Sequence, residues 1–139
     1  MRTYVKRWTA AMLVLFAIAF TAEAKGDQHV SRATVQNSGL TMLEKDLQRG
    51  DSPEIVEGSL YDVVECKNLY PDLDYSQLLE TIIRISKETD NPAIAYKAYL
   101  VSMYLLHSSE IHVKPVPGAE THDYLFKQIA DQLETKLLS

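Results

Sequence analysis

Apolar side chains recur at three- and four-residue steps along most of this chain, which is the spacing of one face of an α-helix. The pattern predicts helices over residues 40–49, 53–69, 74–88, 92–106 and 121–137. The isoleucines of the third segment would also suit a strand, but its length, its flanking caps and its lack of alternation favour a helix. The predicted fold class is therefore all-α, with about five helices.

Helix-start and helix-stop signals support these boundaries. Ser52 and Asn91 each stand before a proline, and a capping side chain followed by proline in the first turn is a typical helix start. Asp74 opens the third segment as a variant of the capping box. Pro71 ends the second segment because it disfavours helical backbone at the residue before it. Thr121 is predicted to cap the last helix.

The helix over residues 92–106 differs from the others because it is apolar on nearly all sides. Such a helix is expected to lie centrally and to be covered on more than one face. Residues 25–39, in contrast, are polar and show no apolar period, so they are predicted to form a flexible leader. A single helical domain over residues 40–139 is expected to follow.

Residues 1–24 have the pattern of a secretory signal peptide, with a basic start, an apolar run and a small-x-small cleavage site. These parts are Arg2, Lys6 and Arg7, then residues 10–20, then Ala22-Glu23-Ala24. The run is about eleven residues long, whereas about twenty residues are needed to cross a bilayer. We expect cleavage after Ala24, export to the periplasm or the extracellular space, and no stable membrane anchor.

The charge balance excludes nucleic acid as a partner. The chain has 14 Lys and Arg and 19 Asp and Glu residues. Removing residues 1–24 takes away three basic residues and one acidic residue, which leaves a net charge of −7. An acidic domain with no basic run to offset this charge repels a phosphate backbone.

No motif for catalysis is found in the sequence. No serine stands in a Gly-x-Ser-x-Gly elbow, no glycine-rich phosphate loop is present, and the single cysteine, Cys66, has no histidine near it in sequence. Cys66 is expected to be a small buried residue, with a reactive thiol as the alternative. The carboxylates are expected to be helix caps and solvated faces: Asp62, Glu65, Asp72, Asp74, Glu80, Glu88 and Asp90. The sequence therefore predicts a protein that is not an enzyme and has no cofactor.

Two segments 39 residues apart have similar helix starts, Asp51-Ser52-Pro53-Glu54-Ile55 and Asp90-Asn91-Pro92-Ala93-Ile94. Each opens an apolar helix, and a second helix follows each of them after a loop. A helix pair that recurs at about forty residues is typical of HEAT and armadillo arrays. Residues 51–106 resemble a HEAT-like repeat, which implies a short pair of helical hairpins. The alternative is a small irregular bundle whose similar caps arose independently.

Tyrosines are concentrated in the middle of the chain. Tyr96, Tyr99 and Met103 stand at three- and four-residue steps, and Tyr104 follows one position further round the helix. Tyrosine is enriched where a protein surface meets a partner. These residues are candidates for binding a partner protein or a second copy of the chain. The alternative is that their rings pack in the core with the hydroxyls at its edge.

Three histidines and one glutamate lie in or beside the proline-containing loop predicted over residues 108–120. They are His107, Glu110, His112 and His122. Imidazole and carboxylate groups bind zinc or copper, so these residues form an alternative site for a metal or a small ligand. No histidine pair has the i, i+4 spacing of a helical metal motif, which favours a solvated polar loop instead.

Overall fold

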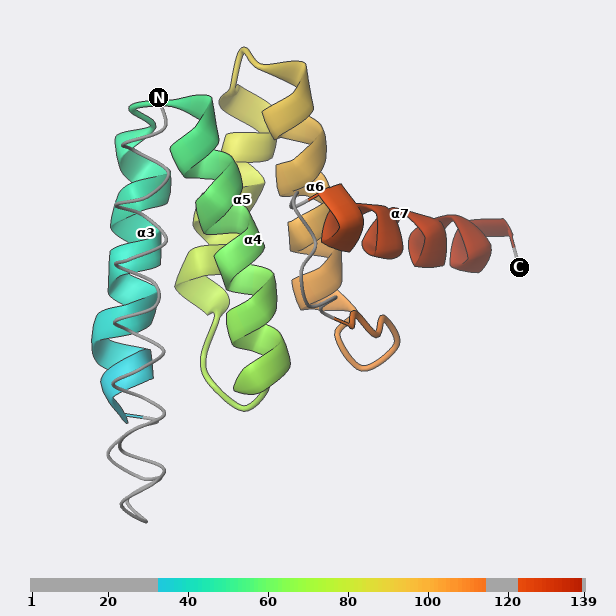
Figure 1. The fold of residues 1–139 in the computed structure, drawn as a ribbon, viewed down its shortest axis with the longest axis horizontal. Coiled ribbons are helices and arrows are strands. Elements are labelled where there is room, and N and C mark those ends of the chain that lie inside the picture. Colours follow the sequence, from blue (N-terminus) through green and yellow to red (C-terminus); the bar gives the residue numbers. More distant parts are fainter. Residues whose placement is uncertain (1–32, 115–122, 139) are drawn as a thin grey trace. The chain divides into compact units, whose positions relative to one another are not determined.

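The computed structural model describes residues 33–114 and 123–138, and this part of the chain is all-α, as predicted. It contains no strand, and its five α-helices match the expected number (Figure 1). A π-helix, η1, precedes them. The elements are η1 (Val35–Gly39), α3 (Leu40–Arg49), α4 (Pro53–Leu69), α5 (Ser76–Glu88), α6 (Pro92–Leu106) and α7 (Asp123–Leu138). The chain divides into two compact units, residues 1–42 and 43–139.

In the first unit, the described residues before α3 are helical, whereas the sequence predicted a flexible leader over residues 25–39. Ala33 and Thr34 are α-helical, and the π-helix η1 continues directly into α3. Thr41 Oγ1 donates a hydrogen bond of 2.9 Å to the carbonyl oxygen of Asn37. Extending an existing helix costs much less than starting one, so polar residues next to α3 become helical without an apolar period. Residues 25–32 lie outside the described residues.

The two predicted cap-and-proline starts are confirmed. Ser52 Oγ accepts a hydrogen bond of 3.2 Å from the N–H of Ile55 at the start of α4. Asn91 Oδ1 accepts hydrogen bonds from the N–H groups of Ala93 and Ile94, at 3.0 and 3.2 Å, at the start of α6. Both oxygens bind N–H groups of a first helical turn, which have no partner inside the helix.

The start of α5 differs from its prediction. Asp74 does not cap the helix three residues on, because Tyr75 is the residue before the first helical position. Asp74 Oδ1 instead accepts hydrogen bonds from the N–H and the hydroxyl of Ser76, at 3.0 and 2.6 Å. This short turn is a common alternative for aspartate, whose side chain reaches the backbone two residues on.

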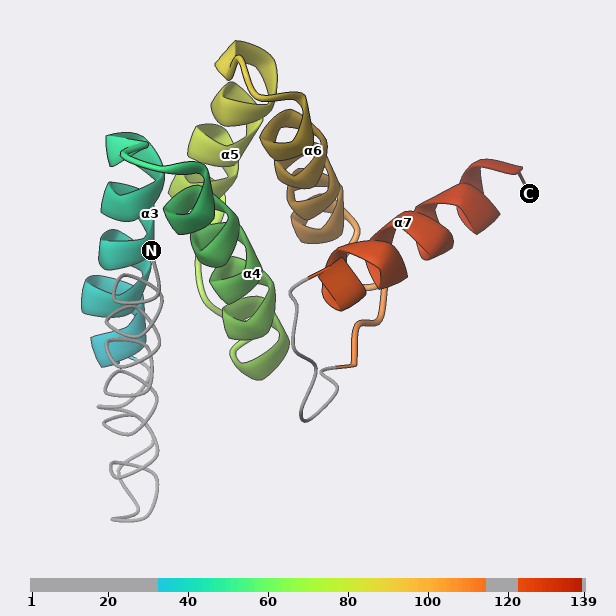
Figure 2. The same ribbon diagram turned by 45° about the horizontal axis from the view of Figure 1, so that its top comes forward.

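Within the second unit, α4, α5 and α6 lie side by side and alternate in direction, and α7 runs at a steep angle to α6 (Figures 1 and 2). α6 contacts α4, α5 and α7, which confirms the central position that its composition predicted. Apolar side chains with almost no exposed surface come from four helices: Leu60, Val63 and Val64 of α4, Ile82 of α5, Ala98 and Val101 of α6, and Ile129 of α7.

Two glutamines attach α7 to the segment that follows α6. Gln132 accepts a hydrogen bond of 2.8 Å from the N–H of His112 and donates one to its carbonyl oxygen. Gln128, one turn earlier, accepts one of 2.9 Å from the N–H of Lys114 and donates one of 2.8 Å to its carbonyl oxygen. Each glutamine thus binds both the N–H and the carbonyl oxygen of one residue: Gln132 binds those of His112, and Gln128 binds those of Lys114.

Apolar packing fixes the same segment from its other side. Ile111 and Val113 are 1% and 5% exposed, whereas His112 and Lys114 between and after them are exposed. The predicted polar loop over residues 108–120 is therefore anchored in the core over its first part. Residues 115–122, including Thr121, lie outside the described residues.

Candidate functional site

One side of α6 carries large apolar side chains that are exposed or half-exposed. Tyr96, Tyr99 and Leu106 are 55%, 43% and 55% exposed, and Met103 is half-buried. Their spacing of three and four residues places them on one side of the helix. We call these four residues the α6 stripe.

The structure corrects the predicted partner-binding set at one position. Tyr104 is only 3% exposed, so it belongs to the core and not to the surface with Tyr96, Tyr99 and Met103. Each residue advances about 100° round an α-helix, which turns Tyr104 away from its neighbour Met103. Burial also raises the pKa of the Tyr104 hydroxyl.

Leu106 replaces Tyr104 in the exposed set. The sequence held a signal for it, because Leu106 follows Met103 by three residues and continues the same helical spacing. The signal was not used because the whole helix is apolar, so its sequence does not distinguish the exposed side from the buried sides. A further exposed aromatic residue, Tyr124, lies on α7 and is 47% exposed.

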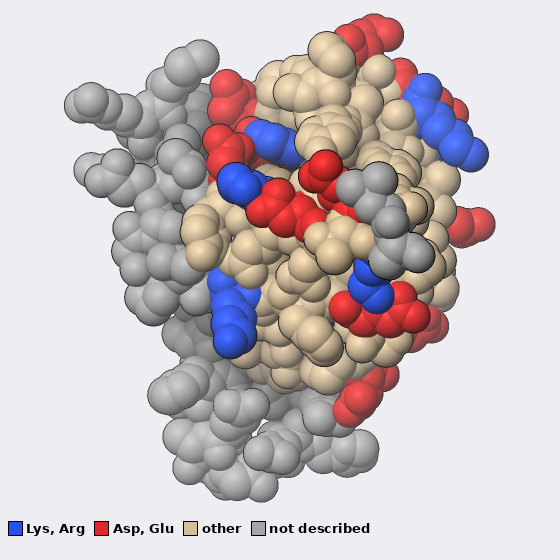
Figure 3. Space-filling model, turned by 90° about the vertical axis from the view of Figure 1, so that its right-hand side faces the viewer, with Lys and Arg blue, Asp and Glu red and all other residues tan. Residues whose placement is uncertain are grey.

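Charged side chains of both signs lie in small groups on the face that Figure 3 shows, with uncharged surface between them. Ion pairs also join three of the helices, because Lys97 Nζ of α6 lies 3.0 Å from Glu57 Oε1 of α4 and 3.1 Å from Asp123 Oδ1 of α7. Lys97 Nζ also lies 5.3 Å from the centre of the Phe126 ring. These contacts hold α6 between its neighbours.

The described residues of the alternative metal site, His107, Glu110 and His112, are not brought together as metal ligands. His107, Glu110 and His112 are exposed, and among the described residues no three His, Cys, Asp or Glu side chains could hold one metal ion. Glu110 Oε2 instead accepts a hydrogen bond of 2.6 Å from Lys136 Nζ. That bond and the lysine charge lower the pKa of Glu110. His122 lies outside the described residues.

Asp62 is an exception to the prediction that the carboxylates are caps or solvated groups. It is 7% exposed on α4, and its Oδ2 atom has no hydrogen-bond partner. Burial, followed by the charges of Glu65 and Asp46, raises the pKa of Asp62 to about 8. Glu65 itself accepts a hydrogen bond of 2.9 Å from the Tyr61 hydroxyl. Asp62 is therefore mostly protonated at neutral pH.

Cys66 is buried, as predicted, and its thiol is shielded by Tyr75. The Tyr75 hydroxyl lies 3.6 Å from Cys66 Sγ and donates a hydrogen bond of 2.8 Å to the carbonyl oxygen of Tyr70. Burial raises the pKa of the thiol. Since the thiolate is the reactive form, burial lowers the reactivity of this cysteine.

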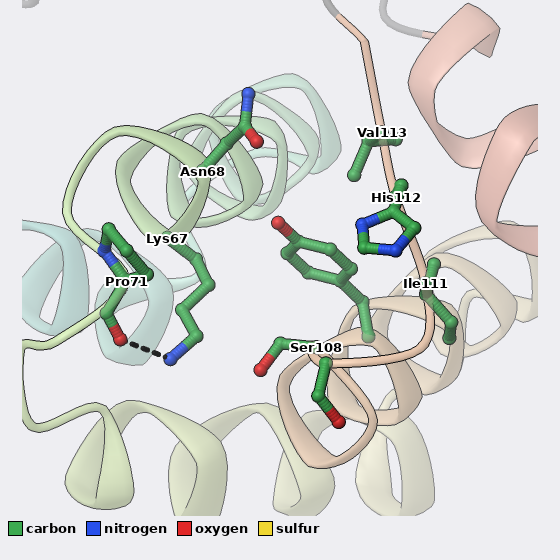
Figure 4. A pocket seen from close by; sticks show the side chains of 9 residues that line it. Lys67, Asn68, Pro71, Ser108, Ile111, His112 and Val113 are labelled. Atoms are coloured by element: carbon green, nitrogen blue, oxygen red, sulfur yellow. Dashed lines mark hydrogen bonds between the residues drawn. The ribbon is translucent and has the colours of Figure 1, made fainter.

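A pocket of about 320 Å³ lies between the end of α4 and the segment that follows α6 (Figure 4). Its walls include Lys67 and Asn68 of α4, Tyr104 of α6, and Ser108, Ile111 and His112. In Figure 4, Lys67 and Pro71 lie on one side and His112 and Ile111 on the other. None of the lining residues carries a carboxylate.

Among the described residues, no helix has both the length and the apolar composition needed to cross a membrane. Comparison of the chain with profiles of protein families, with curated proteins and with solved structures finds no match. The resemblance of residues 51–106 to a HEAT-like repeat therefore stays a prediction.

Proposed function

We propose that this chain is a non-catalytic, exported helical domain that binds another protein chain through the α6 stripe. The observation that carries the proposal is the exposure of three large apolar side chains on one side of a single helix. Isolated exposed apolar residues are common on protein surfaces, but contiguous ones mark interaction sites. The HEAT-like pairing of hairpins over residues 51–106 is the architecture that we propose for this scaffold.

The chemistry of the stripe suits a protein partner. Tyrosine offers a large, rigid contact area with a polar end, and it is enriched among the residues that dominate binding energy. Methionine adapts its shape to different partners. Tyrosine, with only two side-chain torsions, becomes buried in a complex at a low cost in conformational entropy.

The contacts of α6 with its neighbouring helices favour binding without a change in conformation. α4, α5 and α7 all contact this helix, and the ion pairs of Lys97 with Glu57 and Asp123 join it to two of them. A surface that is already ordered before binding loses less entropy when the complex forms. The stripe is thus presented on a fixed helix.

Replacing Tyr99 by alanine should weaken the complex by about fivefold or more, because truncating a hot-spot aromatic residue costs more than about 1 kcal/mol. The partner is first captured with a photo-crosslinking amino acid at position 99, which should give a covalent adduct. The affinity of the purified partner is then measured for the unmodified chain and for the Tyr99→Ala variant. An adduct of twice the chain mass would identify a second copy of the chain as the partner.

Two variants serve as controls. Leu69→Ala removes an apolar side chain of α4 that is 56% exposed, and Lys87→Ala removes an exposed charge of α5. Neither residue lies on the stripe, so both variants should bind as the unmodified protein does. Equal losses for Tyr99→Ala and Leu69→Ala would remove the α6 stripe as the binding surface.

The proposed export has a separate test. Mass spectrometry of the protein recovered from its source should find Lys25 as the first residue, because Ala22-Glu23-Ala24 precedes it as a cleavage site. Ala24→Leu, which places a large residue at the cleavage position, should leave the uncut chain. Recovery of the uncut chain without this substitution would contradict export by cleavage at this position.

A further inference from the structure

We propose that the pocket between the end of α4 and residues 108–113 binds a small organic anion, with Lys67 as its positive charge. This site is separate from the α6 stripe, so the inference does not depend on the proposed function. Three features carry it: the donor groups of the lining, the fixed position of one wall, and the size of the cavity.

The lining offers hydrogen-bond donors and no competing acid. Lys67 contributes an ammonium group, Ser108 and Ser109 contribute hydroxyls, and Asn68 contributes a carboxamide. A carboxylate accepts hydrogen bonds from all of these groups, and its bonds to charged donors are stronger than neutral ones. Although the whole chain is acidic, the lining of this cavity carries a lysine and no carboxylate, which favours an anion.

The ammonium group of Lys67 is already held in place. Its Nζ atom donates a hydrogen bond of 2.7 Å to the carbonyl oxygen of Pro71 and lies 4.8 Å from the centre of the Tyr75 ring. Among the described residues this is its one hydrogen bond, and an ammonium group can make three. The ammonium group therefore keeps hydrogen-bonding capacity for a ligand, and using it costs less entropy than ordering a mobile lysine.

The opposite wall is held by α7. Gln132 binds the N–H and the carbonyl oxygen of His112, and the neighbouring Ile111 side chain is 1% exposed. The imidazole of His112, itself exposed, thus projects from a backbone that is fixed on two sides. Gln132 is a positioning residue for this wall and does not line the pocket.

The cavity sets the size of the ligand. A water molecule takes about 30 Å³ of liquid volume, so 320 Å³ admits about ten non-hydrogen atoms. Tyr104, Ile111 and Val113 form the buried floor of the pocket, so most of the surface that a ligand meets is polar. The ligand class is therefore a compact organic carboxylate, of which benzoate is a suitable probe. We expect a dissociation constant of about 1 mM, because the pocket is open and has one full positive charge.

The experiment is a nuclear magnetic resonance titration of the ¹⁵N-labelled protein with benzoate and with benzamide, its neutral counterpart. Benzoate should shift the amide signals of Lys67, Ser108 and His112 in a saturable way. It should bind about tenfold more tightly than benzamide, the margin expected for one charge-assisted contact. Lys67→Met should abolish this difference, whereas Lys87→Met, the same change at an exposed lysine of α5, should preserve it.

Further variants keep the test decisive if Lys67→Met does not fold. His112→Ala removes a lining side chain and leaves the backbone groups that Gln132 binds, so it should weaken benzoate binding in a folded protein. Gln132→Leu should weaken it too and should broaden the amide signal of His112, which marks a positioning role. Equal affinity for benzoate and benzamide, shifts that do not saturate, or unchanged binding by His112→Ala would each overturn the proposal.

Discussion

Replacing Leu60 by alanine should lower the free energy of unfolding by about 2–5 kcal/mol, the range for deleting most of a fully buried leucine. Leu60 of α4 has no exposed surface, so the truncated side chain would leave a cavity that rigid neighbouring helices cannot fill. Small domains have a total stability of about 5–15 kcal/mol, so this loss would be a large fraction. Urea unfolding followed by circular dichroism measures it as a lower midpoint with an unchanged slope.

The chain offers a matched control for this substitution. Leu69, in the same helix, is 56% exposed, so Leu69→Ala should change the stability by less than about 0.5 kcal/mol. If the two variants lost equal stability, the described packing of α4 would be wrong. A fall in the slope for Leu60→Ala would instead indicate that the second unit no longer unfolds in one step.

Replacing Asp62 by asparagine should make the protein more stable than the unmodified chain in alkaline solution. The folded protein raises the pKa of Asp62 to about 8, and unfolding returns it to its ordinary value near 4. Between these values the folded state binds more protons than the unfolded state. The stability of the unmodified protein therefore falls as the pH rises from about 4 to about 8, and it stays low above that range.

Asparagine removes this dependence because its amide does not ionise. Near pH 9 the gain in the free energy of unfolding should be about 2–5 kcal/mol, and it should shrink towards acid pH. Unfolding by urea at several pH values gives the free energy of unfolding of each protein as a function of pH, and the two proteins should differ in the slope of that function. A constant offset, such as the cost of an unpaired amide donor, does not affect that slope.

Asp90→Asn is the control for the pH series, because Asp90 is exposed at the end of the turn before α6. Its pH dependence should follow that of the unmodified protein. An Asp62→Asn variant with the same pH dependence as Asp90→Asn would show that Asp62 ionises normally in the folded state.

The helices could be predicted because their signals are local. Ser52 and Asn91 mark helix starts through hydrogen bonds that reach only two or three residues, and Gly50, with a φ of 57°, ends α3 in a conformation that glycine adopts readily. The central position of α6 could also be predicted, because a helix that is apolar on all sides needs several neighbours.

Burial within α6 could not be predicted from its composition. Tyr99 and Tyr104 are the same residue type five positions apart, yet one is 43% and the other 3% exposed. Which side of an all-apolar helix faces solvent depends on where α4, α5 and α7 contact it, and the sequence does not give these contacts. Asp62 shows the same limit, because its burial contradicts the usual preference of aspartate for the surface.

The candidate pocket also depends on contacts between residues far apart in sequence. Lys67 precedes His112 by more than forty residues, and no pattern in the sequence brings these two together. The histidines and Glu110 were predicted as an alternative metal site because they lie close together along the chain. In the structure Glu110 pairs with Lys136 of α7, and His112 contributes a pocket wall.

The hydrogen bonds of the two glutamines of α7 restrict substitution at the glutamine positions more than at residues 112 and 114, which the glutamines bind. They bind main-chain groups of residues 112 and 114, so these hydrogen bonds do not depend on the side chains there, and only proline, which lacks the N–H, would remove one. Positions 128 and 132 allow no such freedom, because glutamate cannot donate and asparagine is one carbon shorter. In a laboratory selection for folding alone, we therefore expect Gln128 and Gln132 to be retained while His112 is replaced by other residues.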